Sequence, residues 1–278
     1  MTTWLITGCS TGLGRSLAEA VLKAGHNAVV TARDAGTVQD IVSQFADTAV
    51  AAALDVTDEE QIEKTVAAAQ ERFGTVDVLV NNAGYGYRAA VEEGDEREVD
   101  ALFATNFFGT VSMIKSVLPD MRARRSGTIL NISSIAGRLA APGSGYYSAS
   151  KFAVEGMSDA LRKEVAPLGI RVTIVEPGAF RTDFAGRSLQ QARAKIADYA
   201  DTAGPRRKEN DRTHGTQPGD PTRAAVALID LVGSAELPAR LLLGSDAVKI
   251  VGNEVDGQRR EIEAWKELSI SSDFQTSA

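Results

Sequence analysis

The chain has 278 residues, 44% of them hydrophobic and 24% charged, a composition typical of folded globular proteins that excludes wholesale disorder. It carries 30 Lys and Arg against 37 Asp and Glu, and the net charge of -7 argues against a broad nucleic-acid-binding surface. The single cysteine, Cys9, excludes an internal disulfide and a zinc site built from several cysteines, so we expect no metal centre.

The first residues, 1–6, lack the basic and long apolar regions of a signal peptide. No stretch approaches the ~20 apolar residues that span a bilayer. We therefore expect a soluble cytoplasmic protein without a membrane span.

Seven short apolar runs, rich in β-branched residues, are predicted to be strands. They are Trp4–Thr7, Ala28–Thr31, Val50–Leu54, Val76–Val80, Gly127–Ile132, Val172–Val175 and Arg240–Leu243. Most are continuously apolar and do not alternate with polar residues, which is typical of strands that are covered on both faces of a parallel sheet.

Amphipathic helical stretches separate these runs. Leu13, Leu17 and Val21 form one apolar stripe, and Gly25 follows where a helix C-terminal glycine is expected. Residues 57–60 resemble a capping box that opens a helix ending at Arg72. Such alternation of strand and helix predicts a doubly wound α/β fold.

The segment Gly204–Pro221 breaks this pattern, because it is polar and rich in proline and glycine. It is longer than an ordinary connection. We expect a loop here, either a lid over a ligand site or a disordered segment.

A glycine-rich turn follows the first predicted strand, with Gly8, Gly12 and Gly14 ahead of the first helix. Glycines let the backbone approach a pyrophosphate, which is then held at the helix N-terminus. Three glycines also occur in strand-to-helix turns that bind no ligand, so the motif alone does not show that this turn binds a dinucleotide.

Tyr147 and Lys151 lie four residues apart at the start of a predicted helix, on one face of it. A lysine about 4 Å from a phenol stabilises the phenolate by about 4 kcal/mol, or roughly three pKa units, and would bring a tyrosine towards neutrality. Tyr146 has no lysine four residues later. The competing interpretation is an exposed pair on an amphipathic helix.

Other polar residues follow neighbouring predicted strands. Ser134 comes thirteen residues before Tyr147, Asn82 follows another strand, and Asn106 lies in a helical stretch between them. Ser and Asn often end strands by making local turns. All of these residues in this order and spacing occur by chance much less often than any one of them alone.

Together these residues resemble the short-chain dehydrogenase/reductase family, particularly its hydroxysteroid- and retinol-dehydrogenase-like branch. The resemblance covers residues 3–251 and rests on Thr7-Gly8-x-x-x-Gly12-x-Gly14, Asp55, Asn82-Ala83-Gly84, Asn106, Ser134, Tyr147-x-x-x-Lys151 and Pro177-Gly178. It implies a single Rossmann-type domain with about seven parallel strands.

The resemblance also implies roles for these residues. Tyr147 would exchange the proton with the carbonyl oxygen, Ser134 would polarise that oxygen, and Lys151 would hold the nicotinamide ribose. Asn106 would anchor a water that links Lys151 to solvent. The residues expected to bind the cofactor are Gly8, Ser10, Thr11, Gly12, Leu13, Gly14, Arg33, Asp55, Val56, Asn82, Ala83, Gly84, Tyr147, Lys151, Pro177, Gly178 and Thr182. Asp55 would bind the adenine amino group, and Thr182 would bind the carboxamide or simply cap the next helix.

The end of the second strand favours NADP(H) over NAD(H). At the family's acidic position stands Ala32, and Arg33 follows it, where a guanidinium can bind a 2′-phosphate. Arg15 could add to this site. Two alternatives remain open: Arg33 is a solvated loop residue, or a shift of the alignment by one residue makes Asp34 an NAD-type acid.

We therefore predict an NADP(H)-dependent oxidoreductase that interconverts a carbonyl and an alcohol of a small-molecule substrate. The alternatives are a 3-oxoacyl thioester reductase on the same core and a non-catalytic NADP(H)-binding sensor or scaffold. Residues 1–251 would form the catalytic domain with a substrate loop at 184–221, and residues 252–278 an extension. The family resemblance implies a homodimer or homotetramer.

Overall fold

A computed structural model describes residues 1–186, 188–213 and 215–274. Residues 187 and 214 of the expected substrate loop and residues 275–278 of the expected extension lie outside the described residues. Its centre is a seven-stranded sheet in which every pairing is parallel, in the order β3-β2-β1-β4-β6-β7-β9. The strands are β1 (Thr3–Ile6), β2 (Asn27–Ala32), β3 (Ala49–Ala53), β4 (Val78–Asn81), β6 (Gly127–Ile132), β7 (Ile170–Pro177) and β9 (Arg240–Leu243). The predicted α/β fold and all seven predicted strands are confirmed.

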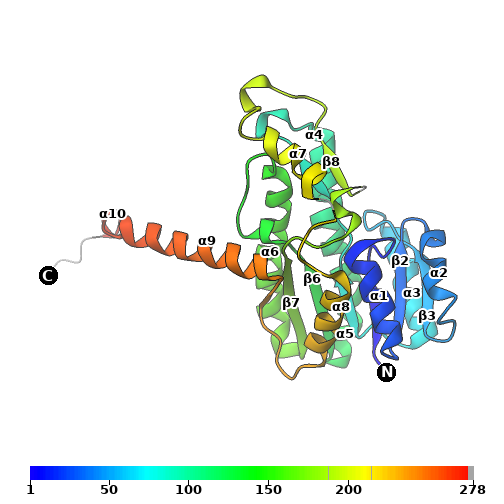
Figure 1. Ribbon diagram of the computed structural model, residues 1–278. Coiled ribbons are helices and arrows are strands. Elements are labelled where there is room, and N and C mark those ends of the chain that lie inside the picture. Colours follow the sequence, from blue (N-terminus) through cyan, green and yellow to red (C-terminus); the bar gives the residue numbers. More distant parts are fainter. Residues whose placement is uncertain (187, 214, 275–278) are drawn as a thin grey trace.

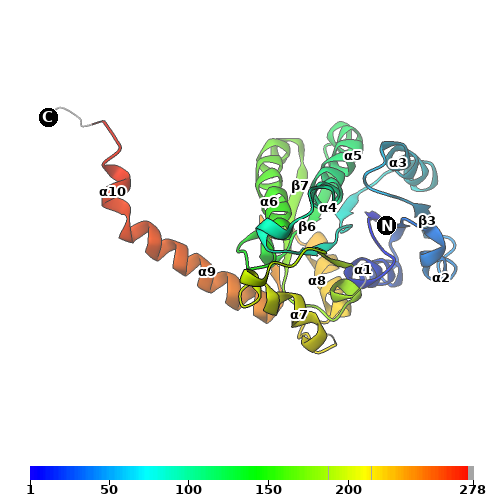
Figure 2. The same cartoon turned by 90° about the horizontal axis from the view of Figure 1, so that it is seen from above.

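Helices cover both faces of the sheet (Figures 1 and 2). One face packs against α1 (Gly12–Lys23), α2 (Gln39–Val42) and α8 (Pro221–Gly233). The other face packs against α3 (Glu59–Phe73), α5 (Thr110–Arg124) and α6 (Gly145–Val165). Because both faces are covered, most strands are largely apolar, as the sequence predicted, although β7 also carries Arg171 and Glu176.

The first helices begin and end at residues whose chemistry explains the boundary. Leu17 and Val21 bury the apolar stripe of α1, and Gly25 follows the helix at φ +80°, as expected. The capping box at residues 57–60 was wrong in detail. Asp58 is the cap of α3 and accepts a hydrogen bond from the Gln61 backbone nitrogen at 3.1 Å.

A long helical stretch runs from α4 (Glu96–Phe103) through a π-helical segment, Ala104–Gly109, into α5. By length and composition this stretch, Glu96–Arg124, could cross a membrane, which the sequence analysis had not anticipated. In the fold, Leu102 and Met113 of this stretch are completely buried in the core, whereas Phe108 is 59% exposed. Core helices commonly reach this length and apolarity, so the stretch is weak evidence for a span.

Two strands and one helix near the site were among the elements that were not predicted. β5 (Gly86–Arg88) and β8 (Leu189–Gln191) pair in a small parallel sheet beyond the carboxyl ends of the main strands. The helix α7 (Gly204–Thr213) occupies most of the stretch that was expected to be a loop, so that prediction was wrong for these residues.

Charged anchors explain why α7 forms without an apolar stripe. The Arg207 guanidinium is ion-paired with the Glu93 carboxylate, whose side chain is completely buried. Arg206 Nε donates to Ser144 Oγ at 3.3 Å. Tertiary ion pairing of this kind has no periodic signal in the sequence.

After β9, the helix α9 (Ser245–Ala264) packs its first turns on the domain through Ala247 and Val251. It then leaves the domain and continues into α10 (Lys266–Ile270), far from the rest of the molecule (Figures 1 and 2). We call residues 252–274 the C-terminal arm.

Candidate active site

The turn between β1 and α1 is shaped by its glycines. Gly8 and Gly12 have φ of +72° and +65°, values that side-chain-bearing residues rarely adopt. A Cβ on Gly14 would collide with the Asn82 side chain and the Gly8 carbonyl. Gly8 and Gly12 are therefore required by the backbone conformation of the turn, and Gly14 is required because no side chain fits between the turn and Asn82.

Asn82 holds this turn against the end of β4. Its Nδ2 donates to the Thr7 and Gly8 carbonyl oxygens at 2.8 and 3.0 Å. Thr7 Oγ1 in turn accepts hydrogen bonds from the backbone nitrogens of Asn82 and Ala83, both at 2.9 Å. The two predicted motifs thus form one interlocked structure.

The N-terminus of α1 is suited to an anionic ligand. Its cap residue, Thr11, makes no side-chain hydrogen bond to the helix, and the first turn contains no acidic residue. A cavity of about 460 Å³ lies in front of this turn and is lined by Ser10, Thr11, Gly12, Arg15, Ser16, Glu19, Arg181, Thr182, Asp183 and Pro221. Uncapped helix N–H groups that face a cavity fit the pyrophosphate of a dinucleotide.

Charged residues at the end of β2 bear on the choice of dinucleotide. Ala32 is buried, and Arg33 is exposed directly after it. Asp34, the alternative acid, instead caps its own turn by accepting from the Gly36 backbone nitrogen at 2.9 Å. Arg15 is held by ion pairs with Asp40 and Glu19.

The four predicted catalytic residues converge beyond the ends of β4 and β6. Tyr147 and Lys151 share a face of α6, with Lys151 Nζ 5.9 Å from the centre of the tyrosine ring. Lys151 Nζ donates to the Ile132 carbonyl at 2.8 Å, which fixes the lysine against the end of β6. Ser134, two residues further on, accepts from the Ala136 backbone nitrogen at 3.1 Å, and its hydroxyl acts to lower the pKa of Tyr147.

The electrostatics of this cluster correct one expectation. Burial raises the pKa of Tyr147, although the Ser134 hydrogen bond and the charges of Arg88 and Arg206 oppose the rise. The cations that lower the pKa of Tyr147 are Arg88 and Arg206, and Lys151 is not among them. Burial lowers the pKa of Lys151 itself to about 8. The predicted fall of the Tyr147 pKa through Lys151 is therefore wrong for this structure.

Asn106 lies in the π-helical segment and faces the same cluster. Its Nδ2 donates to Tyr85 O at 2.9 Å and Ser150 Oγ at 3.1 Å, and its Oδ1 accepts from Tyr85 N at 3.0 Å. A Cβ on Gly84 would lie 3.0 Å from Asn106 Oδ1 and 3.6 Å from Lys151 Nζ. Gly84 thus leaves room between the asparagine and the lysine.

The other predicted residues extend along the same edge of the sheet. Asp55 and Val56 follow β3, and Asp55 Oδ1 accepts from Thr57 N at 2.9 Å. Pro177 ends β7, and a Cβ on Gly178 would collide with the Asp246 carboxylate. The candidates therefore form a row from β3 to β7, not one compact cluster.

Thr182 caps the next helix, which is one of the two alternatives considered for it. Its Oγ1 accepts from the Phe184 backbone nitrogen at 3.3 Å and caps the short helix Asp183–Ala185. The same side chain lies against Gly12 and lines the cavity in front of α1.

Three further residues around Tyr147 come from segments expected to contact the substrate, and two of them, Arg88 and Arg206, were not predicted individually. The ring of Phe184 lies 5.9 Å from that of Tyr147. Arg88 and Arg206 both donate to Ser144 Oγ, one helical turn before Tyr147. These residues come from β5, α7 and the segment between β7 and β8, and no local spacing connects them.

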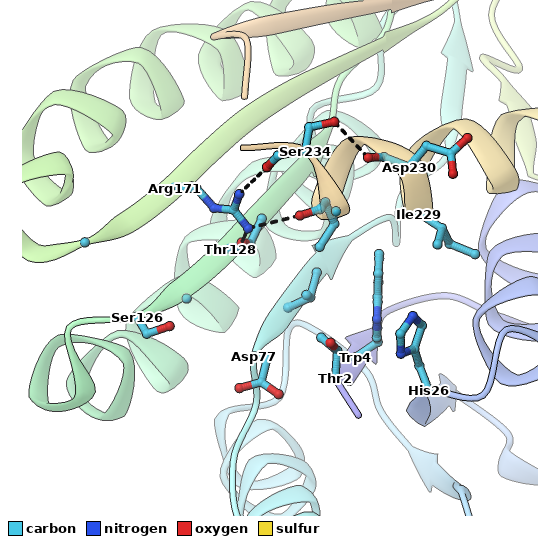
Figure 3. A pocket seen from close by; sticks show the side chains of 15 residues that line it. Thr2, Trp4, His26, Asp77, Ser126, Thr128, Arg171, Ile229, Asp230 and Ser234 are labelled. Atoms are coloured by element: carbon cyan, nitrogen blue, oxygen red, sulfur yellow. Dashed lines mark hydrogen bonds between the residues drawn. The ribbon is translucent and has the colours of Figure 1, made fainter. Parts of the chain in front are cut away.

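A larger cavity, of about 750 Å³, lies at the opposite, amino-terminal edge of the sheet (Figure 3). Trp4 and His26 line one side of it, and Arg171 reaches across the other to bond Ser234 O and Thr128 Oγ1, both at 2.9 Å. None of the predicted site residues, all of which are among the described residues, lines this cavity.

Comparison with known proteins decides the family. The model of the short chain dehydrogenase family matches residues 2–193. The chain belongs to this family. The expected enzyme class, an oxidoreductase acting on CH–OH groups, is confirmed by this membership.

Individual relatives of this short-chain dehydrogenase are similar to it over most of its length. It is 40% identical to oxidoreductase BOA17 of Botryotinia fuckeliana over 97% of this chain and 98% of that protein. It is 34% identical to retinol dehydrogenase 8 of Bos taurus, over 86% and 80%. A short-chain dehydrogenase structure from Streptomyces avermitilis, 42% identical, covers 98% of this chain and 100% of its own with a TM-score of 0.92.

Solved short-chain dehydrogenases of this fold carry either dinucleotide. An alcohol dehydrogenase from Thermococcus sibiricus, complexed with 5-hydroxy-NADP, is 26% identical over 87% of this chain and 96% of its own, with a TM-score of 0.72. A Burkholderia phymatum protein in complex with NAD is 22% identical over 100% and 98%, with a TM-score of 0.80, and shares the fold.

Proposed function

We propose that this short-chain dehydrogenase is an NADP(H)-dependent enzyme that interconverts a carbonyl and an alcohol, with Tyr147 as the general acid and base. The observation that carries the proposal is the convergence of Ser134, Tyr147 and Lys151 at the sheet edge that also presents the uncapped N-terminus of α1. Family membership gives the reaction class, and this arrangement gives each residue a task.

Ser134, Tyr147 and Lys151 have different roles at the substrate oxygen. Ser134 lies close enough to Tyr147 to affect the pKa of the tyrosine, and both hydroxyls would donate to one carbonyl oxygen. Burial raises the pKa of Tyr147, which keeps it protonated and able to give a proton in the reductive direction. Lys151, fixed by the Ile132 carbonyl, supplies a nearby ammonium below pH 8.

The dinucleotide would lie along the row of candidates between β3 and β7. Gly8, Ser10, Thr11, Gly12, Leu13 and Gly14 would surround its pyrophosphate, and Asp55 and Val56 its adenine. Asn82, Ala83, Gly84, Pro177, Gly178 and Thr182 would border its nicotinamide half, together with Tyr147 and Lys151. When bound, the nicotinamide supplies or accepts the hydride.

The preference for NADP(H) rests on Arg33. Its guanidinium is exposed just beyond β2, whereas Asp34 is engaged in its own turn and Ala32 offers no repulsion. A guanidinium binds a phosphate through two hydrogen bonds, which favours the 2′-phosphate. Arg15 contributes less, because Asp40 and Glu19 hold it.

The remaining proposals concern organisation. Residues 1–251 form the catalytic domain, the segment 184–221 covers the substrate site, and 252–278 is an extension. We also propose a cytoplasmic homo-oligomer that acts on small molecules and binds no nucleic acid.

Replacing Tyr147 tests the reaction. We expect Tyr147→Phe to lower kcat by about 10²- to 10⁴-fold, since the proton donor is lost, and to change the Kd of NADPH less than about threefold. Turnover is measured on ketones, aldehydes and alcohols, including retinol, hydroxysteroids and a 3-oxoacyl thioester, with both nicotinamides.

The neighbouring tyrosine provides the matched control. Tyr146 donates its hydroxyl to the Val91 carbonyl at 2.6 Å and is not assigned to the reaction. Tyr146→Phe should keep kcat within about threefold of the parent. Unchanged turnover in Tyr147→Phe would exclude the assignment, and binding of NADPH without turnover of any substrate would favour the sensor alternative.

Replacing Arg33 tests the cofactor. Arg33→Ala should raise the Kd of NADPH at least about tenfold, because charge-assisted hydrogen bonds to the phosphate are lost, and leave the Kd of NADH unchanged. Asp34→Asn is the control and should change neither constant. Tighter binding of NADH than of NADPH by the parent enzyme would contradict the proposed preference.

A further inference from the structure

The C-terminal arm, residues 252–274, leaves the domain as a helix that the rest of the described chain does not cover. Val251 is the last buried residue, and every residue from 258 to 274 is exposed. Isolated helices of this length are marginal in water. The solved Streptomyces avermitilis relative covers 98% of this chain, so most of the arm has a counterpart there.

An apolar stripe runs along one side of the arm. Val255, Ile262 and Trp265 are 45%, 71% and 59% exposed. Their spacing of seven and three residues continues the positions of Val248 and Val251, with Gln258 completing the series. These are the a and d positions of a heptad repeat, the pattern by which one helix packs along another.

Acidic residues lie on one side of this stripe and basic residues on the other. Glu254 and Glu261 occupy the g positions on one flank, and Arg259 and Lys266 occupy the e positions on the other. In a parallel pair of identical helices each g residue faces the e residue five positions later, so Glu254 meets Arg259 and Glu261 meets Lys266 of the other copy. An antiparallel pair would bring like charges together.

The total charge of the arm disfavours a lipid surface. Residues 252–274 contain three basic and six acidic residues, a net charge of -3. Helices that lie on anionic membranes are rich in Lys and Arg on their polar face. A second copy of the chain offers both the apolar stripe and the opposite charges that this helix needs.

We propose that the C-terminal arm pairs in parallel and in register with the arm of a second copy of this chain. The contact adds to any association made by the domains, and it does not depend on the proposed reaction. The apolar stripe forms the seam, and the two g-to-e charge pairs on each side set the direction.

Cysteine cross-linking in the full-length protein tests the register. Val255→Cys and Ile262→Cys are made separately and oxidised, because a parallel, in-register pair places each of these residues beside itself. Cys9 is completely buried and does not interfere. We expect both variants to form disulfide-linked dimers on a non-reducing gel, and the control Arg260→Cys, on the outer face, to form at least fivefold less.

The outcomes are decisive in each direction. An antiparallel pair can cross-link at most one of the two positions with itself, so a single positive variant overturns the proposal. Failure of both also overturns it. Binding of the arm to phosphatidylserine vesicles, without cross-links, would assign the stripe to a membrane and not to a second copy.

Charge exchange in the Val255→Cys background tests the flanks. Glu254→Lys with Glu261→Lys, or Arg259→Glu with Lys266→Glu, places like charges across the seam, and each double change should reduce cross-linking at least fivefold. Mixing the two proteins should restore it as a heterodimer. Undiminished cross-linking in the separate proteins, or no recovery on mixing, would contradict the charge pairing.

Discussion

At the scale of single residues, Lys151 shows that a catalytic candidate can weaken the fold that contains it. Its pKa falls from 10.5 to about 8 because burial disfavours the ammonium. Between these pH values the unfolded chain binds more protons than the folded one. This group's contribution to stability therefore rises as the pH rises from about 8 to 10.5, and at pH 7 the fold carries the full cost.

Replacing the ammonium with an apolar group of similar length should remove that cost. We expect Lys151→Met to raise the free energy of unfolding at pH 7 by up to about 3 kcal/mol, and the gain to shrink above pH 10.5. Turnover should be lost in the same variant. Urea unfolding at the two pH values measures the effect, and a variant less stable than its parent at pH 7 would contradict the burial argument.

Local spacing explains which site residues could be predicted. Tyr147 and Lys151 share a helix face because they are four residues apart, and Ser134 lies at the end of a predicted strand. Arg88 and Arg206 meet at Ser144 although they are far apart in the sequence. Their placement depends on how β5 and α7 fold over the site, and no short-range pattern carries that information.

At the scale of elements, α7 depends on one buried ion pair. Without Arg207, the Glu93 carboxylate would stay buried and lose its charged partner, which is costly. We expect Arg207→Met to speed amide hydrogen exchange in residues 204–208 at least about tenfold. Lys208→Met, at an exposed neighbour, is the control and should leave exchange unchanged. Equal protection in the two variants would show that other contacts hold the helix.

The same scale explains the success and the failures of the fold prediction. Most of the seven core strands are largely apolar runs, and α1 has an apolar stripe, so their burial can be inferred from the local pattern of apolar residues. β5 and β8 have three residues each, too few for any periodicity. In α7 the polar composition predicted a loop, because the ion pair with Glu93 is a tertiary contact.

At the scale of the whole molecule, Cys9 can report global unfolding. The thiol is completely buried between the sheet and α1, and burial raises its pKa to about 12. Only the thiolate reacts with thiol reagents. We expect DTNB to label the native protein at least about 10³-fold more slowly than the protein in urea, where one thiol per chain should react. Complete labelling of the native protein within minutes would show a local opening of the glycine-rich turn.

The uncapped first turn of α1 has a consequence beyond ligand binding. A dinucleotide held there by the folded chain alone stabilises that state, by about 2.7 kcal/mol when its concentration is 100 times its Kd. Proteases act mainly on opened chains. The lifetime of this protein in a cell should therefore increase when the dinucleotide concentration rises and decrease when it falls. The amount of enzyme would then follow the concentration of the cofactor that it needs.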